Sequence, residues 1–461
     1  MQHSYEGLDR PGGFSRVNLL APLRHRNFRL LWTGMTVSLL GDGIFLVAMA
    51  WEAYVLWNAP AALSILGIGM TIPTIAFLLP AGVISDRVDR RLLMLCADVG
   101  RAVVIALLAT LALTGLLTFW ELVALVAVYG IGTAFFTPAF DAIVPDILPA
   151  SDLPAANSLD QFVRPIALRL AGPAVGGWLV AAFGTGVAFA VDAGSFVASA
   201  VALVVMQSPP HPRAEHVESP VAAVKEGLRF VRSRVWLWGT LLSAAVAYLA
   251  FLGPAEVLLP YLVKNELHAS AGDLGLVFAA GGVGAIGSAL VMGQRGHPRR
   301  DVTFMYASWT LATLAVAGYG LATASWQLML ACLIFNALET VGTIVWATIK
   351  QRHVPASMLG RVSSLDWLIS IGLLPLSFAL TAPIAAAVGA RATLIGAAVI
   401  GGVVTLGALF LRGMRDIEGV AHDDLGESKR PALSREPELR KSPAFADVAP
   451  ADEGLPQAVS R

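Results

Sequence analysis

The sequence predicts an all-α membrane protein with twelve transmembrane helices. Hydrophobic residues make up 56% of the 461 residues and charged residues only 14%, about half the charged share of an average soluble domain. The mean hydropathy is +0.69, and a membrane-spanning helix needs ~20 mostly apolar residues. Twelve stretches meet this requirement: 28–56, 63–84, 92–113, 120–140, 157–182, 186–206, 237–259, 273–293, 303–321, 326–348, 363–385 and 392–411.

The distribution of Lys and Arg predicts the orientation of these spans. Cytoplasmic loops of membrane proteins carry an excess of both residues. With the N-terminus inside, the six outer loops hold only Lys264 and Arg391. We therefore expect a multi-pass protein of the cell membrane with both termini in the cytoplasm. The bases of the short inner loops are Arg87, Arg90, Arg91, Arg295, Arg299, Arg300, Lys350, Arg352 and Arg361.

One long connection divides the chain into two bundles of six spans. It begins with a proline-rich stretch and continues into 221–234, which carries Lys225, Arg229 and Arg232 on one helical face and predicts an amphipathic surface helix. The polar composition after 411 predicts a disordered tail. The expected organisation is a cytoplasmic N-terminal segment (1–27), an N-terminal bundle (28–206), a central cytoplasmic loop (207–236), a C-terminal bundle (237–411) and a cytoplasmic tail (412–461).

The chemistry-bearing residues argue against an enzyme. No Gly-x-x-x-x-Gly-Lys-[Ser/Thr] phosphate loop occurs, and the Gly-x-Gly-x-x-Gly stretch at 282–287 lies inside a span, where tight helix packing is the better interpretation. All eight histidines lie in loops or tails, and Cys96 and Cys332 lie in separate spans, which predicts no metal site and no disulfide. A net charge of zero argues against a nucleic-acid partner. We expect no cofactor, and a monomer whose partners are the bilayer, a small-molecule cargo and protons.

Charged residues inside the spans are candidate functional residues. A charge near the bilayer centre costs ~2.5–3.5 kcal/mol on insertion scales, so each one needs a cavity or a partner. Asp42 lies about fifteen residues into the first span, Glu339 lies near the middle of the tenth, and Arg169 in the fifth has no partner at helical spacing. Asp98 and Arg101 are three residues apart in the third span, which favours a structural ion pair.

Two motifs predict close contacts and a turn. Gly172 and Gly176 in the fifth span form a Gly-x-x-x-Gly face, and Pro173 between them removes a backbone hydrogen bond and can bend the helix. The charged turn at 82–91 separates the second and third spans, and a degraded copy of it at 294–300 follows the eighth span. The two halves therefore look related but functionally unequal, as in transporters built from repeats.

These motifs resemble those of the major facilitator superfamily. Its Gly-x-x-x-Asp-Arg-x-Gly-Arg-Arg signature is similar to the turn formed by Gly82, Asp86, Arg87, Arg90 and Arg91, with Asp89 at the usual glycine position. Its antiporter signature resembles Gly172, Pro173, Gly176 and Gly177, with Leu168 at a further glycine position. Stretches similar to the macrolide-efflux and enterobactin-exporter branch are Ser38-x-x-Gly41-Asp42, Phe136-Thr137-Pro138-Ala139, Leu153-x-x-Ala156-Asn157, Glu226 to Phe230 and Gly360 to Ser363.

The resemblance implies alternating access around a midplane cavity. It places Asp42, Glu339, Arg169, Asn336 and Trp346 on the cavity walls, with Arg169 able to pair with Asp42. A proton carried by Asp42 or Glu339 would drive the export of a lipophilic or amphipathic small molecule, such as a drug, a macrolide-like natural product or a siderophore.

The resemblance also implies a gate at the cytoplasmic face. Asp86, together with Arg87, Arg90 and Arg91, would hold the two halves together in the outward-open state, with Asp366 as the partner of one arginine. Two alternatives stay open from the sequence. One is an uptake carrier for a small organic solute, and the other is a membrane scaffold or sensor that has the same fold but carries no flux.

Overall fold

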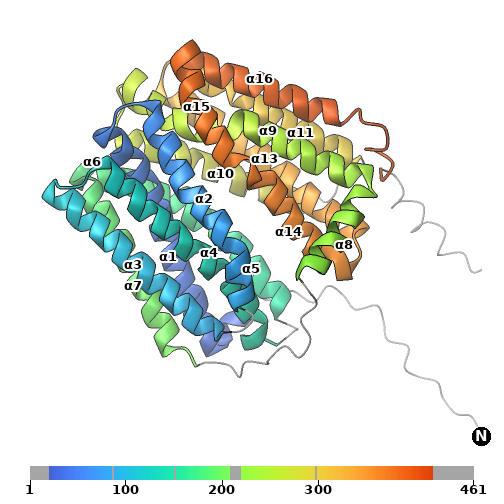
Figure 1. Cartoon of the computed structure of the whole chain (residues 1–461), viewed down its shortest axis with the longest axis horizontal. Helices are drawn as coiled ribbons and strands as arrows, with labels where there is room; N and C mark the ends of the chain where they lie inside the picture. Colours follow the sequence, from blue (N-terminus) through green and yellow to red (C-terminus); the bar gives the residue numbers. More distant parts are fainter. Residues whose placement is uncertain are drawn as a thin grey trace, which may run out of the picture. The chain divides into compact units, whose positions relative to one another are not determined.

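The computed structural model describes residues 20–85, 88–149, 152–207, 220–295, 298 and 300–418, and every regular element within these ranges is a helix (Figure 1). The N-terminal half contains a short 3-10 helix η1 (Ala21–Arg24), α1 (Arg26–Leu56), α2 (Pro60–Ser85), α3 (Arg90–Thr114), α4 (Phe119–Ile147), α5 (Leu153–Pro165), η2 (Ile166–Ala171), α6 (Gly172–Phe183) and α7 (Thr185–Val205). The connecting helix α8 (Pro220–Arg232) precedes the C-terminal half, which contains α9 (Val235–Tyr261), η3 (Leu262–Glu266), α10 (Ala271–Arg295), α11 (Asp301–Ala315), α12 (Ala317–Leu321), α13 (Ser325–His353), α14 (Ala356–Gly372), α15 (Leu374–Val388) and α16 (Ala390–Ala408).

The predicted all-α membrane fold is confirmed. Eleven helical segments of the described chain are long and apolar enough to cross a membrane. The remaining expected span, 303–321, is divided into α11 and α12. The division falls at Val316, where backbone bonds three residues apart tighten the helix.

The fifth expected span is one continuous path with a π-helical centre. Its three segments are α5, η2 and α6, and η2 is the π-helical one. Pro173 follows directly and has no N–H to donate, so a wider helical turn before it removes the clash that a proline causes in a regular helix. The same turn carries Arg169.

Two ends of the bundle can be told apart by their loops. The short-loop end is formed by the connections 57–59, 115–118, 184, 267–270, 322–324 and 389. The opposite end, which we name the basic end, carries Arg90 on α3, Lys225 on α8 and Arg352 on α13.

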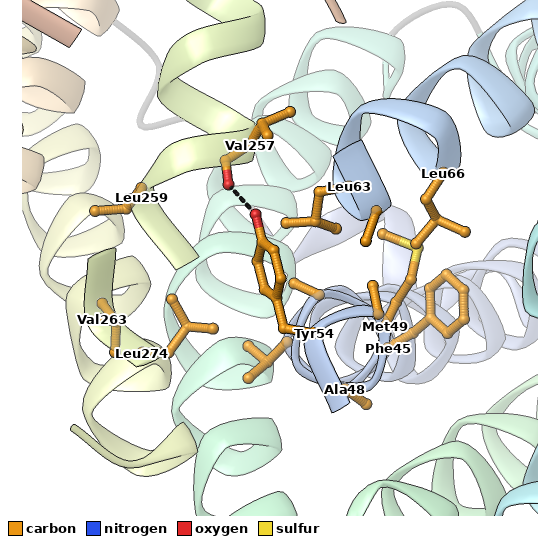
Figure 2. Packing of buried hydrophobic residues seen from close by; sticks show 14 of the residues in the cluster. Phe45, Ala48, Met49, Tyr54, Leu63, Leu66, Val257, Leu259, Val263 and Leu274 are labelled. Atoms are coloured by element: carbon orange, nitrogen blue, oxygen red, sulfur yellow. Dashed lines mark hydrogen bonds between the residues drawn. The ribbon is translucent and has the colours of Figure 1, made fainter. Parts of the chain in front are cut away.

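The buried core joins the two halves at only one of these ends. At the short-loop end one hydrophobic cluster contains residues of α1, α2 and α7 together with residues of α9, α10 and α15. Near the basic end the core consists of two clusters, one within each half. Figure 2 shows the joined core around Tyr54 of α1, whose hydroxyl donates a 2.6 Å hydrogen bond to the Val257 carbonyl oxygen of α9.

Two expected boundaries change in the structure, and one expected helix is confirmed. The sequence predicts that the fourth span ends near residue 140, but α4 continues through Pro138 to Ile147. The predicted amphipathic helix of the central loop is present as α8. Residues 412–418, which the prediction assigned to a disordered tail, pack on the C-terminal half instead. Met414 there is fully buried and Glu418 accepts hydrogen bonds from Thr303. The rest of that predicted tail, 419–461, lies outside the described residues.

Candidate functional site

Charged side chains from both halves act on one another inside the membrane-length segments. Arg169 of η2 and Glu256 of α9 are both exposed, although each lies within such a segment. Arg169 is close enough to act electrostatically on Glu256 and on Tyr248, and Glu339 of α13 also acts on Tyr248. Exposed charges at this depth need water or a ligand, so these four residues form the candidate cargo site.

Backbone packing places Arg169 at the contact of η2 and α6 with α10 of the other half, which we call the seam. Gly282 of α10 lies so close to it that an added Cβ would stand 2.5 Å from the Arg169 carbonyl oxygen. The glycines at 281–284 thus serve close helix contact, because Gly284 is packed in the same way against Leu333 of α13.

Two residues expected on the cavity wall have other partners. Trp346 is buried, packs edge to face against Trp236 and Trp309 within the C-terminal half, and donates a 2.8 Å hydrogen bond to Asp366. It is therefore part of the core, and its placement on the wall was wrong. Asn336 is half-buried and its amide donates to the Cys332 carbonyl oxygen at 2.9 Å.

A second group of charges lies inside the N-terminal half. Asp98 and Arg101 of α3 form an ion pair of 2.5 Å and are 0% and 4% exposed. The guanidinium lies between the rings of Phe136 and Phe196, at 4.6 and 4.4 Å from their centroids, a cation–π arrangement that helps to hold a desolvated Arg. Ser199 of α7 donates 2.6 Å to the second Asp98 oxygen, so each carboxylate oxygen has a partner.

Asp42 and Asp192 lie beside this ion pair. Asp42 of α1 is half-buried and accepts a 2.5 Å hydrogen bond from the Tyr129 hydroxyl of α4. The cations that act on Asp42 are Arg101 and Arg164. The expected pairing of Asp42 with Arg169 is therefore not formed, because Arg169 projects toward the seam instead.

The expected gate residues bind within their own halves. Arg90 forms a 2.5 Å ion pair with Asp146 of α4, and Arg91 donates to the carbonyl oxygens of Leu203 and Val204 on α7. In the C-terminal half Asp366 pairs with Lys350 and accepts a hydrogen bond from Trp346, and not from Arg90 or Arg91, the described arginines of the turn. Gly82 lies within α2, and Asp86 and Arg87 lie outside the described residues.

The glycine motif packs on two different neighbours. Gly172 and Gly176 lie against Gly43 and Ile44 of α1, where an added Cβ on either glycine would stand within 2.8 Å of backbone atoms. Gly177 instead faces Gly275 of α10, in the other half. One short motif thus fixes α6 to its own bundle and to the opposite one, with Pro173 at its first turn.

Sequence reasoning missed Glu256, Tyr129 and the burial of Asp192. The charges singled out in the spans did not include Glu256 or Asp192, and Asp192 is 0% exposed. A signal for the latter existed, because Asp192, Ser195 and Ser199 recur at helical spacing on one face of the sixth span. Tyr129 gave no such signal, since its role depends on which helix lies opposite.

Comparison with known proteins places this arrangement in a family. The model of the transmembrane secretion effector family matches residues 17–443. The enterobactin exporter EntS of Citrobacter koseri is 27% identical over 361 residues, which cover 76% of this chain and 83% of that protein. Macrolide efflux protein A of Streptococcus pyogenes is 23% identical over 366 residues, with coverages of 78% and 90%. The uncharacterized MFS-type transporter YfiS of Bacillus subtilis is 26% identical over 345 residues, with coverages of 72% and 80%.

Solved structures share the fold. A bacterial homologue of the iron transporter ferroportin, solved in an inward-facing state, superposes with a TM-score of 0.62 at 16% identity and covers 84% of this chain and 98% of its own. The nucleoside transporter NupG superposes with a TM-score of 0.63 at 10% identity, with coverages of 82% and 98%. The family match spans nearly the whole described chain, and the helical bundle agrees with it. The protein therefore belongs to the transmembrane secretion effector family of major facilitator transporters, on the branch of the macrolide-efflux proteins and enterobactin exporters.

Proposed function

We propose that the protein is a proton-coupled exporter of lipophilic or amphipathic small molecules. The observation that carries this proposal is the placement of Arg169, Glu256 and Glu339, two of them exposed, between halves that share a core at one end only. A cargo that enters between the halves from the basic end would meet these charges halfway across. The named activities of two relatives, a macrolide efflux protein and an enterobactin exporter, support export as the direction of transport.

The proposed orientation places the basic end in the cytoplasm. Short cytoplasmic loops carry the excess of Lys and Arg, and the basic end is where Arg90, Lys225 and Arg352 lie. In this orientation the described conformation faces inward, ready to take cargo from the cytoplasm or the inner leaflet. The outward-open state would then require the basic end to close, with Asp86 and the arginines of its turn as the contacts between the halves.

Cargo binding and proton binding fall on different residues in this proposal. Glu339, Glu256 and Arg169 offer both signs of charge beside the ring of Tyr248, which suits an amphipathic cargo with one polar end. Asp42 carries the proton, because it lies in the N-terminal half beside Tyr129 and away from the seam. The proton gradient supplies the energy, so no cofactor is needed.

Transport in vesicles tests the proposal. The full chain is reconstituted into liposomes that contain a pH-sensitive dye, and a macrolide, a catecholate siderophore and the cationic dye ethidium are added in turn. We expect at least one compound to move protons in the direction opposite to itself. Asp42→Asn should lower this coupled flux at least tenfold while cargo binding is kept, whereas Glu339→Gln should mainly weaken binding. Ser370→Ala is the control for differences in purification and reconstitution.

Two outcomes would contradict the exporter, and a third would contradict the assignment of its proton-binding residue. Movement of cargo and protons in the same direction would identify an uptake carrier. Binding with no flux of either would identify a scaffold or sensor. Full coupling in an Asp42→Asn, Glu339→Gln double variant would show that neither carboxylate carries the proton.

A further inference from the structure

Asp192 of α7 is a buried carboxyl group that the cargo site does not use. It is 0% exposed. Its Oδ1 atom receives only a 3.1 Å bond from the Ser195 hydroxyl, which points mainly to the Asp192 carbonyl oxygen at 2.7 Å. The Oδ2 atom has no hydrogen-bond partner among the described residues. A carboxyl group so placed is unusual, because buried polar atoms are almost always paired.

The backbone of α1 is shaped to admit this carboxyl group. Gly41 lies directly against Asp192 and Ser195, and a Cβ at that position would overlap both side chains. The next residue is Asp42, whose charge acts on Asp192. Asp42 and Asp192 are therefore electrostatic neighbours at the contact between α1 and α7, and we treat their two carboxyl groups as a pair.

The charges around this pair do not balance. The ionisable groups that act on it are Asp98 and Arg101 of α3, Tyr129 of α4 and Arg164 of α5. The Arg101 guanidinium is already bound to Asp98 at 2.5 Å, and Arg164 is bound to Asp160 at 3.2 Å. Both nearby cations are thus committed to other carboxylates.

Two adjacent carboxylates without a cation of their own cannot both stay ionised in a buried place. An uncompensated buried charge costs several kcal/mol, and two carboxyl groups that share a site hold a proton between them. Asp42 is half-buried and has the Tyr129 hydroxyl as donor, so it suits the ionised partner. Asp192 has an unpartnered oxygen and no exposed surface, so it suits the protonated one.

We propose that Asp192 and Asp42 form a proton-binding pair in which Asp192 holds the proton in the described conformation and Asp42 passes it to water. The proton leaves the Asp192 carboxyl oxygen for the Asp42 carboxylate, so Asp42 becomes the neutral acid and Asp192 becomes the anion. Water then takes the proton from Asp42, and the pair, now carrying two negative charges, binds a new proton from the other side of the membrane when the halves change conformation. This inference rests on the proposed function and deepens it, because it names a second acid and separates proton storage from cargo binding.

A proton fits this place better than a metal ion. Na⁺ and divalent cations need several oxygen ligands around one point, and the described residues contain no group of three or more His, Cys, Asp or Glu side chains arranged for a metal. A proton needs one acceptor oxygen, which the Asp192 Oδ2 atom provides.

Infrared difference spectroscopy tests the pair directly. The full chain in lipid vesicles is measured between acidic and alkaline buffer without cargo, and a protonated buried carboxyl group gives its own carbonyl stretching band. We expect this band in the unmodified protein and its loss in Asp192→Asn. Ser195→Ala should keep the band but move it to higher frequency, because the carbonyl loses its weak donor. Asp366→Asn, which removes a carboxylate paired with Lys350, should leave the band unchanged.

Several results would overturn the pair. The band could persist in Asp192→Asn, or Ser195→Ala could leave its frequency unchanged. The band could also vanish when Na⁺ or Mg²⁺ is added at constant acidic pH, which would identify a cation site. A thermal unfolding curve of each variant shows whether a lost band reflects a misfolded protein. If Asp192→Asn does not fold, the frequency shift of the band in Ser195→Ala tests the pair instead.

This measurement separates the inference from the proposed function. A band assigned to Asp192 in a protein that moves no protons with any cargo would support the pair and refute the coupled exporter. Coupled export with a band that does not depend on Asp192 would refute only the pair.

Discussion

The two halves share a fold but differ in the side chains that their interiors bury. The N-terminal half surrounds the Asp98–Arg101 ion pair with Asp42, Asp192 and two serines, all at or below half exposure. The C-terminal half buries rings instead, chiefly Trp236, Tyr306 and Trp346 in its cluster toward the basic end. Its ion pair, Lys350 with Asp366, lies nearer the surface, at 14% and 13% exposure.

This difference suggests a division of labour between related bundles. A polar interior can change its protonation state, whereas an aromatic interior packs at high density and stays rigid. The N-terminal half therefore has the means to bind an ion, and the C-terminal half has the means to hold its shape while the seam moves. The degraded copy of the charged turn at 294–300 fits the same inequality.

Removal of one carboxylate from each half gives the largest contrast. Asp98→Ala should lower the free energy of unfolding by ~3–5 kcal/mol, because Arg101 is left buried without its partner. Asp366→Ala should cost about 1 kcal/mol, since Lys350 can extend its ammonium group to water. Thermal and denaturant unfolding of the purified variants in detergent measures both effects.

A double variant checks the cause of the larger loss. Asp98→Ala combined with Arg101→Met should recover much of the stability, because neither member of the buried ion pair is left without its partner. Equal losses in Asp98→Ala and Asp366→Ala would remove the contrast between the two interiors.

Serine donors give a smaller and closely matched contrast. Ser199→Ala removes a 2.6 Å donor from the fully buried Asp98, and hydrogen bonds to charged groups contribute ~1.5–3 kcal/mol. Ser370→Ala removes a 3.3 Å donor from Asp366, which keeps Lys350 and Trp346 as partners. We expect about 2 kcal/mol for the first and less than about 0.5 kcal/mol for the second. The same unfolding assay measures both losses. The contrast would fail if Ser370→Ala lowered the free energy of unfolding more than Ser199→Ala.

The fold could be predicted from composition and spacing, because a bilayer imposes length and hydrophobicity on every span. Eleven of the expected spans appear as long helices in the described chain. The prediction failed where tertiary contacts decide the local structure. Residues 303–321 are divided at Val316, and α4 continues through Pro138, which its neighbours in the bundle make tolerable.

The site could be predicted only in part, because a sequence shows which residues are charged and not which helices they face. Asp98 and Arg101 lie on one helix at ion-pair spacing, so their contact could be foreseen. The contact of Asp42 with Tyr129 joins α1 to α4 across 87 residues, and no local pattern encodes it. Trp346 was misplaced for the same reason, since the direction of its side chain depends on Trp236 and Trp309.

The seam between the halves gives the smallest and most symmetrical test. Gly177 of α6 and Gly275 of α10 face each other, and an added Cβ on either would stand 2.8 Å from the Cα atom of the other. Ala at either position should weaken the joined core by about 1 kcal/mol, at the low end for overpacking, because the two helices can separate there. Unlike the paired changes in the two interiors, these two substitutions should have similar effects, with Gly275→Ala slightly the larger, because its Cβ would stand 2.5 Å from the Pro173 carbonyl oxygen.

A cysteine at Leu63, beside Tyr54 in the joined core (Figure 2), reports whether this core opens. In a background without Cys96 and Cys332, a water-soluble thiol reagent should label it about fivefold faster in Gly177→Ala and in Gly275→Ala, the factor that ~1 kcal/mol represents. Gly287→Ala on α10 is the control, because its Cβ would meet nothing within 4 Å. If only one of the two glycine substitutions raised the labelling rate, the two halves would contribute unequally to the stability of the seam. The inequality seen in their interiors would then extend to the surface along which they move.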